Sequence, residues 1–228
     1  SGEARLLYSR PSASLRLVVP LMLVLLLMPC AGEIIDRVAV TVENSVITES
    51  EILRQIRLTA FFEGEKPDYS LSKKREVADR LVEQMLVRKE ISEVRYGAPE
   101  KLNPAPVVDQ IRQRYSSREE YLKALAAHGL TEAEVEAHVL WQLTLLNFID
   151  QRLRPGVQVS DAEVEDYYRT QFLPQQAKIS PESVPSLEES REKIEEILMQ
   201  QRVNQALDRW LGEGRRQTNI RFRQEVFQ

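Results

Sequence analysis

Near the start of the chain, the alternation of apolar and polar residues predicts a β-hairpin. The segment Val38–Val42 places valine at every second position, which is the pattern of a half-buried strand. Glu43-Asn44-Ser45 can then reverse the chain, because asparagine tolerates the left-handed backbone of tight turns. Val46 and Ile47 begin a second short strand. A hairpin alone is marginally stable in water, so a third strand or a helical cover is expected.

The third strand is predicted at the other end of the chain. Ile220 and Phe222 alternate with polar residues between Asn219 and Arg223, again with a period of two. The N-terminal hairpin and this C-terminal strand would then form one small sheet, and the residues between them would be helical. The predicted fold class is therefore mainly α, a helical domain with a small β-sheet.

Five sequences of the form Ser/Thr-x-x-Glu mark the starts of predicted helices. In this capping box, the hydroxyl and the carboxylate each accept a hydrogen bond from a backbone N–H group that the helix leaves free. The boxes are Thr48/Glu51, Ser117/Glu120, Thr131/Glu134, Ser160/Glu163 and Ser186/Glu189. The predicted helices span about residues 49–62, 72–96, 104–115, 118–128, 132–154, 161–172 and 187–211.

Apolar residues recur on one face of three of these helices, with the 3.6-residue period that predicts burial. They are Val77, Leu81, Met85, Val87, Ile91 and Val94 in the second helix, Val135, Val139, Leu143, Leu146 and Ile149 in the fifth, and Ile194, Ile197, Leu198, Val203, Leu207 and Trp210 in the last.

Residues 1–32 have the three parts of a secretory signal peptide. Three arginines precede an apolar run, Leu17–Met28, and Cys30-Ala31-Gly32 supplies small residues for cleavage after residue 32. The alternative is an uncleaved segment that anchors the protein to the inner membrane. The run is about twelve residues long and contains Pro20, whereas a spanning helix needs about 20 apolar residues. Cleavage, leaving no stable membrane span, is therefore the favoured prediction.

Composition and motifs exclude several function classes. Cys30 is the only cysteine, so cleavage would leave no thiol for a disulfide, a nucleophile or a metal site. A lipid anchor on Cys30 is disfavoured because Pro29 precedes it instead of a small residue. The net charge of −4 gives no reason to expect nucleic-acid binding.

The sequence also lacks the motifs of the common enzyme classes. It contains no HExxH, P-loop, GxGxxG or GxSxG sequence. His128 and His138, the only histidines, lie on predicted helices and are interpreted as structural. We therefore predict no catalytic residue, no metal ligand and no cofactor.

Three stretches resemble the SurA-like periplasmic chaperones, which are relatives of the PrsA and PpiD foldases. These stretches are VAVTVENSVITESEI at 38–52, LVEQMLVRKE at 81–90 and VSDAEVEDYY at 159–168. The resemblance spans nearly all of the chain after residue 32. It implies a helical domain of the SurA N-terminal type, a periplasmic location and a role in folding outer-membrane proteins.

The chain departs from that family after VSDAEVEDYY, where a parvulin-type prolyl isomerase domain is usually inserted. Fewer than about twenty residues separate Tyr168 from the last predicted helix, and a globular domain needs about 50. The predicted organisation is a signal peptide at 1–32, a helical chaperone domain at 33–172, a linker at 173–186 in place of the parvulin domain, and a C-terminal helix and strand at 187–228 that complete the same domain. The linker prediction rests on Pro174, Pro181 and Pro185.

The resemblance and the missing insert together imply an ATP-independent holdase that binds unfolded polypeptides. Aromatic side chains suit sequence-tolerant binding, because they offer a large contact area with few torsions to restrict. The candidate client-binding residues are Phe61, Phe62, Tyr69, Tyr115 and Tyr121. For each of them, the alternative is that the ring fills the core or its rim.

Two other functions remain open at this stage. The chain could be a degenerate or inactive member of the peptidyl-prolyl isomerase family, or an assembly subunit that binds one folded partner. The expected partners of a holdase are unfolded or partly folded polypeptides, with outer-membrane proteins foremost, and the protein is expected to be a monomer or a dimer.

Overall fold

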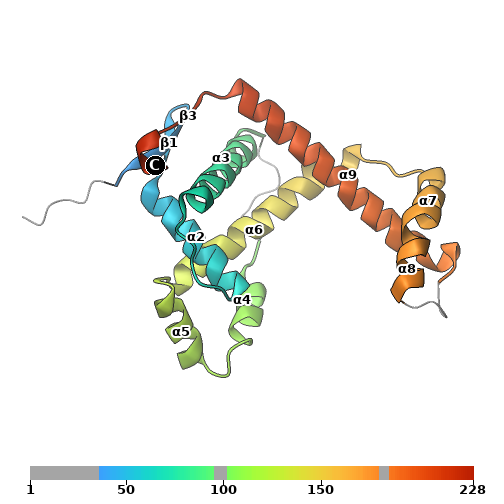
Figure 1. Cartoon of the computed structure of the whole chain (residues 1–228), viewed down its shortest axis with the longest axis horizontal. Helices are drawn as coiled ribbons and strands as arrows, with labels where there is room; N and C mark the ends of the chain where they lie inside the picture. Colours follow the sequence, from blue (N-terminus) through green and yellow to red (C-terminus); the bar gives the residue numbers. More distant parts are fainter. Residues whose placement is uncertain (1–35, 95–101, 180–184) are drawn as a thin grey trace, which may run out of the picture. The chain divides into compact units, whose positions relative to one another are not determined.

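The computed structural model describes residues 36–94, 102–179 and 185–228 (Figure 1). Within these residues the chain is mainly helical and contains one three-stranded sheet, which confirms the predicted fold class. The predicted signal peptide at 1–32 lies outside the described residues, as do Tyr96 and Pro181 and the side chain of Val94. None of the described helices is long and apolar enough to cross a membrane.

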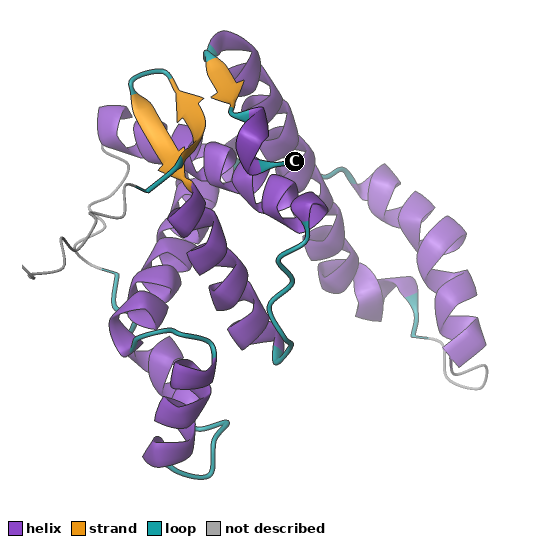
Figure 2. Ribbon diagram, turned by 60° about the vertical axis from the view of Figure 1, so that its left-hand side comes forward, coloured by secondary structure: helices purple, strands orange, loops and turns teal. Residues whose placement is uncertain are grey.

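The sheet joins the two ends of the described chain (Figure 2). Its strands are β1 (Val38–Val42), β2 (Ser45–Thr48) and β3 (Ile220–Phe222), with β1 in the centre and both pairs antiparallel. Val40 pairs with Ile47 on one side and with Phe222 on the other. The predicted third strand is therefore confirmed.

The turn between β1 and β2 differs from its prediction in one detail. The residue with positive φ is Glu43, at 51°, and not Asn44. The backbone N–H of Glu43 donates to the carbonyl of Asn219 at 2.9 Å, and its carboxylate lies 2.9 Å from Nζ of Lys89. These two contacts position Glu43 against the segment before β3 and against α3 (Leu71–Val94).

The helices follow the predicted order. They are α2 (Glu49–Glu63), α3, α4 (Ala105–Arg112), α5 (Arg118–Ala127), α6 (Glu132–Arg152), α7 (Asp161–Tyr167), α8 (Leu173–Ile179) and α9 (Leu187–Gln217), with a π-helical turn at Tyr168–Phe172 and 3-10 turns at Arg154–Gly156 and Gln224–Val226.

Each of the five predicted capping boxes begins a helix. The box is reciprocal at Thr48, Thr131, Ser160 and Ser186. At Ser117 only half of it forms, because the Glu120 carboxylate accepts from Ser116 Oγ at 2.6 Å instead of from the backbone of Ser117.

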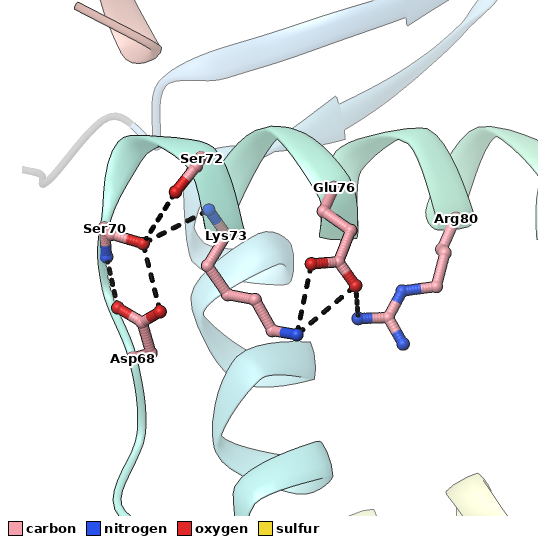
Figure 3. Close-up of polar contacts among 6 residues, drawn as sticks. All are labelled: Asp68, Ser70, Ser72, Lys73, Glu76 and Arg80. Atoms are coloured by element: carbon pink, nitrogen blue, oxygen red, sulfur yellow. Dashed lines mark hydrogen bonds and ion pairs between the residues drawn. The ribbon is translucent and has the colours of Figure 1, made fainter.

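The start of α3 is capped by a local polar network that the sequence analysis did not identify (Figure 3). Ser70 Oγ accepts from the backbone N–H of Lys73, and Asp68 accepts from the backbone N–H of Ser70 at 2.8 Å. The hydrogen bonds that Asp68 accepts from the backbone N–H and the hydroxyl of Ser70 lower the pKa of its carboxyl group. One turn further, Glu76 lies 3.2 Å from Nζ of Lys73 and 3.0 Å from Nη2 of Arg80. Exposed pairs of this kind contribute about 1 kcal/mol or less, so they orient side chains more than they stabilise the fold.

Two segments are more helical than predicted. The predicted linker at 173–186 contains α8, which continues without a break from the π-helical turn at Tyr168–Phe172, with Pro174 as its second residue. The last helix was predicted to end near residue 211, but α9 continues through Gly212 and Gly214 to Gln217. Arg215 in this extension contacts Asp79 at 2.6 Å and Glu83 at 3.2 Å on α3, which favours the extra turn.

The described core is divided into four clusters of buried apolar side chains. The first joins the sheet to α2 and α3, with Val40 and Val77 among its buried members. The second joins α2 to α4, α5 and α6. The third joins α3 and α6 to Trp210 on α9. The fourth joins α7 and the π-helical turn to the first half of α9 around Val164 and Ile194.

Ser190 is a polar residue inside the fourth cluster. It is 2% exposed, and its Oγ has no hydrogen-bond partner among the described residues. A buried hydroxyl without a partner loses its hydrogen bonds to water, and alanine is the better helix former. Ser190→Ala is therefore expected to raise the free energy of unfolding by about 1 kcal/mol, measured by urea denaturation. A loss of stability in this variant would show that the hydroxyl has a stabilising partner.

Candidate functional site

Four of the five aromatic candidates lie in one cluster of rings. The Phe61 ring contacts those of Phe62 at 5.6 Å, Tyr115 at 6.3 Å and Tyr121 at 6.3 Å between centroids. Phe61 and Tyr121 are 5% and 0% exposed and belong to the second core cluster. Helix packing places both rings in the core, which is the alternative that the sequence left open for each of them.

The other three candidates remain accessible to different degrees. Phe62 and Tyr115 are half-buried at the rim of the second cluster. Tyr69, in the loop before α3, is 47% exposed and lies apart from the second cluster. Only Phe62 also lines one of the hollows described next.

The first hollow lies beside the sheet and is formed by β2, α2, α3 and α6. We call it the sheet-side hollow; its volume is about 440 Å³. Its apolar wall includes Val46, Leu81, Met85 and Trp141. Val46 lies on β2, and its side chain is 48% exposed in this hollow.

The second hollow lies between α2, α3, α4 and α6, and we call it the α4-side hollow. Its volume is about 600 Å³, and its apolar wall includes Phe62, Val107, Leu143 and Leu146. Leu146 was predicted to be buried with the rest of its helix face, but it is 57% exposed. The predicted face is buried at Val135 and Val139, but further along α6 the buried residues are Trp141 and Phe148, which lie on another face.

The two hollows adjoin one another. Gln55, Gln84 and His138 line both of them, so the hollows are neighbours along α2, α3 and α6, and we refer to the two together as the groove. One exposed aliphatic side chain lies in each half, Val46 in the sheet-side hollow and Leu146 in the α4-side hollow. The shared lining includes the amide side chains of Gln55 and Gln84, which can both donate and accept hydrogen bonds.

His138 occupies the shared part of the groove. Its ring lies 4.9 Å from the Phe62 ring between centroids, and its Nε2 lies 3.2 Å from Nε2 of Gln142. Burial lowers the pKa of His138 below its ordinary value, because desolvation disfavours the charged ring. The ring is therefore neutral at pH 7 and presents an apolar face to the groove.

The lowered pKa of His138 predicts a pH dependence of stability. The unfolded chain binds the proton more tightly than the folded one, so this stabilisation is complete above the unfolded pKa and is lost as the pH falls through it toward the folded pKa. Between about pH 7.5 and about pH 5.5, the wild-type protein should lose more free energy of unfolding than His138→Gln does. Urea denaturation at both pH values measures this. Equal losses in the two proteins would contradict the burial of the ring.

His128 does not contribute to the groove. Its Nδ1 lies 2.9 Å from the carbonyl oxygen of Ala124, and its Nε2 lies 3.1 Å from that of Glu65. The ring thus connects the end of α5 to the loop that follows α2, which is a structural role. Among the described residues, no group of three or more His, Cys, Asp or Glu side chains could hold a metal ion.

Comparison with known protein families finds no family model that matches the chain, and no curated protein matches it either. Sequence reasoning missed Val46, Leu146, Gln55 and His138 as groove residues. Only the two adjacent phenylalanines indicated that α2 has a second apolar side.

Proposed function

We propose that the protein is an ATP-independent holdase that binds unfolded polypeptide segments in the groove formed by the two hollows. The observation that carries this proposal is the exposure of Val46 and Leu146, 48% and 57%, in adjoining hollows that share their lining. Aliphatic side chains left exposed inside a concave surface are typical of a binding site.

The size and lining of the groove suit weak binding of many sequences. Volumes of about 440 and 600 Å³ accommodate a few side chains each, and both hollows are open at the surface. Met85 adapts its shape to different apolar groups. Gln55 and Gln84 can bond the backbone of any extended chain, because a peptide group offers both a donor and an acceptor.

The sequence resemblance to SurA-like chaperones supports the same function and suggests its setting. A signal peptide at 1–32 would direct the protein to the periplasm, and the resemblance implies outer-membrane proteins among its clients. The alternative of an assembly subunit predicts high affinity for one folded partner. A holdase instead binds unrelated unfolded polypeptides with similar affinities.

The test is a light-scattering assay with an unfolded β-barrel protein diluted from urea in the absence of ATP. A few-fold molar excess of the protein should slow the rise in scattering, and should do the same for a second, unrelated unfolded protein. Unchanged scattering with both clients would overturn the proposal. Protection of one client alone would favour the assembly subunit.

We also expect no prolyl isomerase activity, because the short segment between Tyr168 and α9 leaves no room for a parvulin domain. The rate of cis–trans isomerisation of a proline tetrapeptide should be the same with and without the protein. Catalysed turnover would favour the alternative of a functional isomerase family member.

A further inference from the structure

The charged side chains of the sheet-side hollow are unequally partnered. Its two carboxylates both serve as helix caps: Glu51 accepts from the backbone N–H of Thr48 at 2.9 Å, and Glu134 accepts from that of Thr131 at 2.8 Å. A carboxylate that accepts backbone hydrogen bonds at a helix start already has its charge stabilised there. Both carboxylates therefore already have hydrogen-bond partners within the protein.

The two arginines of this hollow differ from one another. Arg54 lies 3.9 Å from Glu51, so it has an acidic neighbour. Arg88 has no carboxylate partner among the described residues. Its guanidinium carbon lies 4.0 Å from the centroid of the Trp141 ring, and this cation–π contact is the partner that the structure gives it.

The environment of Arg88 favours an additional anionic partner. Its side chain remains open to solvent, yet desolvation by its neighbours lowers its pKa. A guanidinium that lies over an aromatic ring keeps N–H donors at its edge, in the fork geometry that matches a carboxylate. A ligand carboxylate at this edge would offset part of the desolvation of the charge.

Apolar surface lies next to this cation. Val46, Leu81 and Met85 line the same hollow as Arg88, and Trp141 is 7% exposed beneath it. A segment that fills the hollow thus meets an apolar wall and, at Arg88, a guanidinium that has no carboxylate partner among the described residues.

We propose that the sheet-side hollow selects apolar polypeptide segments that carry an acidic side chain, with the aspartate or glutamate carboxylate bound by Arg88. This specificity rests on the proposed holdase function and refines it: the protein would retain segments with an acidic residue beside aliphatic or aromatic ones, and would release those with a lysine at that place.

The experiment uses three labelled peptides that share one apolar sequence and differ at a central residue, which is Asp, Asn or Lys. Fluorescence anisotropy with the whole protein gives the dissociation constants. We expect the Asp peptide to bind about fivefold more tightly than the Asn peptide, which is the effect of one partly exposed ion pair, and the Lys peptide to bind most weakly. The preference should decrease as the salt concentration rises, because ions screen an accessible pair.

Variants test whether Arg88 is the origin of the preference. Arg88→Gln should bring the ratio of the Asp and Asn dissociation constants close to one, and Arg88→Glu should reverse the order of the Asp and Lys peptides. The matched control is Lys89→Gln, which removes the same charge from the next position on α3. Lys89 lies outside the groove and pairs with Glu43, so its variant should keep the fivefold preference. Circular dichroism of each variant checks the fold.

The outcomes of this experiment distinguish the acidic preference from the holdase function on which it rests. Binding of all three peptides with equal affinity would overturn the acidic preference and leave the holdase proposal standing. A preference that persists in Arg88→Gln would also overturn the role of Arg88. Binding of none of the peptides would contradict both proposals.

Discussion

A variant that carries both Val46→Ser and Leu146→Ser is expected to bind unfolded polypeptide about tenfold more weakly than the wild-type protein. Both side chains are about half exposed in the free protein, and a bound segment would cover the rest of them. Loss of this additional apolar burial costs about 1.5 kcal/mol in total, which is a factor of about ten in the dissociation constant. Fluorescence anisotropy with a labelled unfolded client measures it.

The matched control for this variant is Leu122→Ser. Leu122 is 41% exposed on α5 and lies outside both hollows, so Leu122→Ser removes about as much exposed apolar surface as one of the two groove substitutions and leaves the groove unchanged. All three substitutions are at accessible positions and should change the free energy of unfolding by about 0.5 kcal/mol or less each. If Leu122→Ser cost half or more of the binding free energy that the double variant loses, clients would bind to general surface hydrophobicity rather than to the groove.

The largest effect on stability is expected from Phe61→Ala. The ring is 5% exposed and lies among those of Phe62, Tyr115, Tyr121 and His128. Its removal leaves a cavity where α2 meets α4, α5 and α6, so the free energy of unfolding should fall by about 3–5 kcal/mol. Urea denaturation followed by circular dichroism measures the change.

Tyr69→Ala provides the comparison for Phe61→Ala. Tyr69 is an aromatic residue from the same set of candidates but is 47% exposed, so its removal should cost about 0.5 kcal/mol or less. If Phe61→Ala lowered the free energy of unfolding as little as Tyr69→Ala does, the ring cluster would not be part of the core. Phe61 would then again be a candidate for client binding.

The small sheet and the helix starts could be predicted because their signals are local. Alternation in Val38–Val42 and around Ile220 identified strands without reference to their neighbours. The capping boxes depend on residues three positions apart, so the starts of α2, α6 and α9 followed directly from the sequence. The end of α9 was missed because it depends on ion pairs between Arg215 and α3, more than a hundred residues away in the chain.

The groove could not be predicted in the same way. The helical period predicted burial along one face of α6, but the neighbouring helices bury Val139 and Phe148, which lie on different faces, and leave Leu146 exposed. The two adjacent phenylalanines illustrate the same limit. The sequence indicated that Phe61 and Phe62 point in different directions, but only the packing of α5 and α6 shows that Phe61 is the buried one.

The central claim, that an unfolded chain lies in the groove, is tested most directly by site-specific photocrosslinking. A photoreactive amino acid is placed at position 46, 146 or 122, and each protein is irradiated with the same unfolded client. The account predicts strong client crosslinks from positions 46 and 146 and weak ones from position 122. Crosslinks that are strongest from position 122, or equally weak from all three, would contradict it.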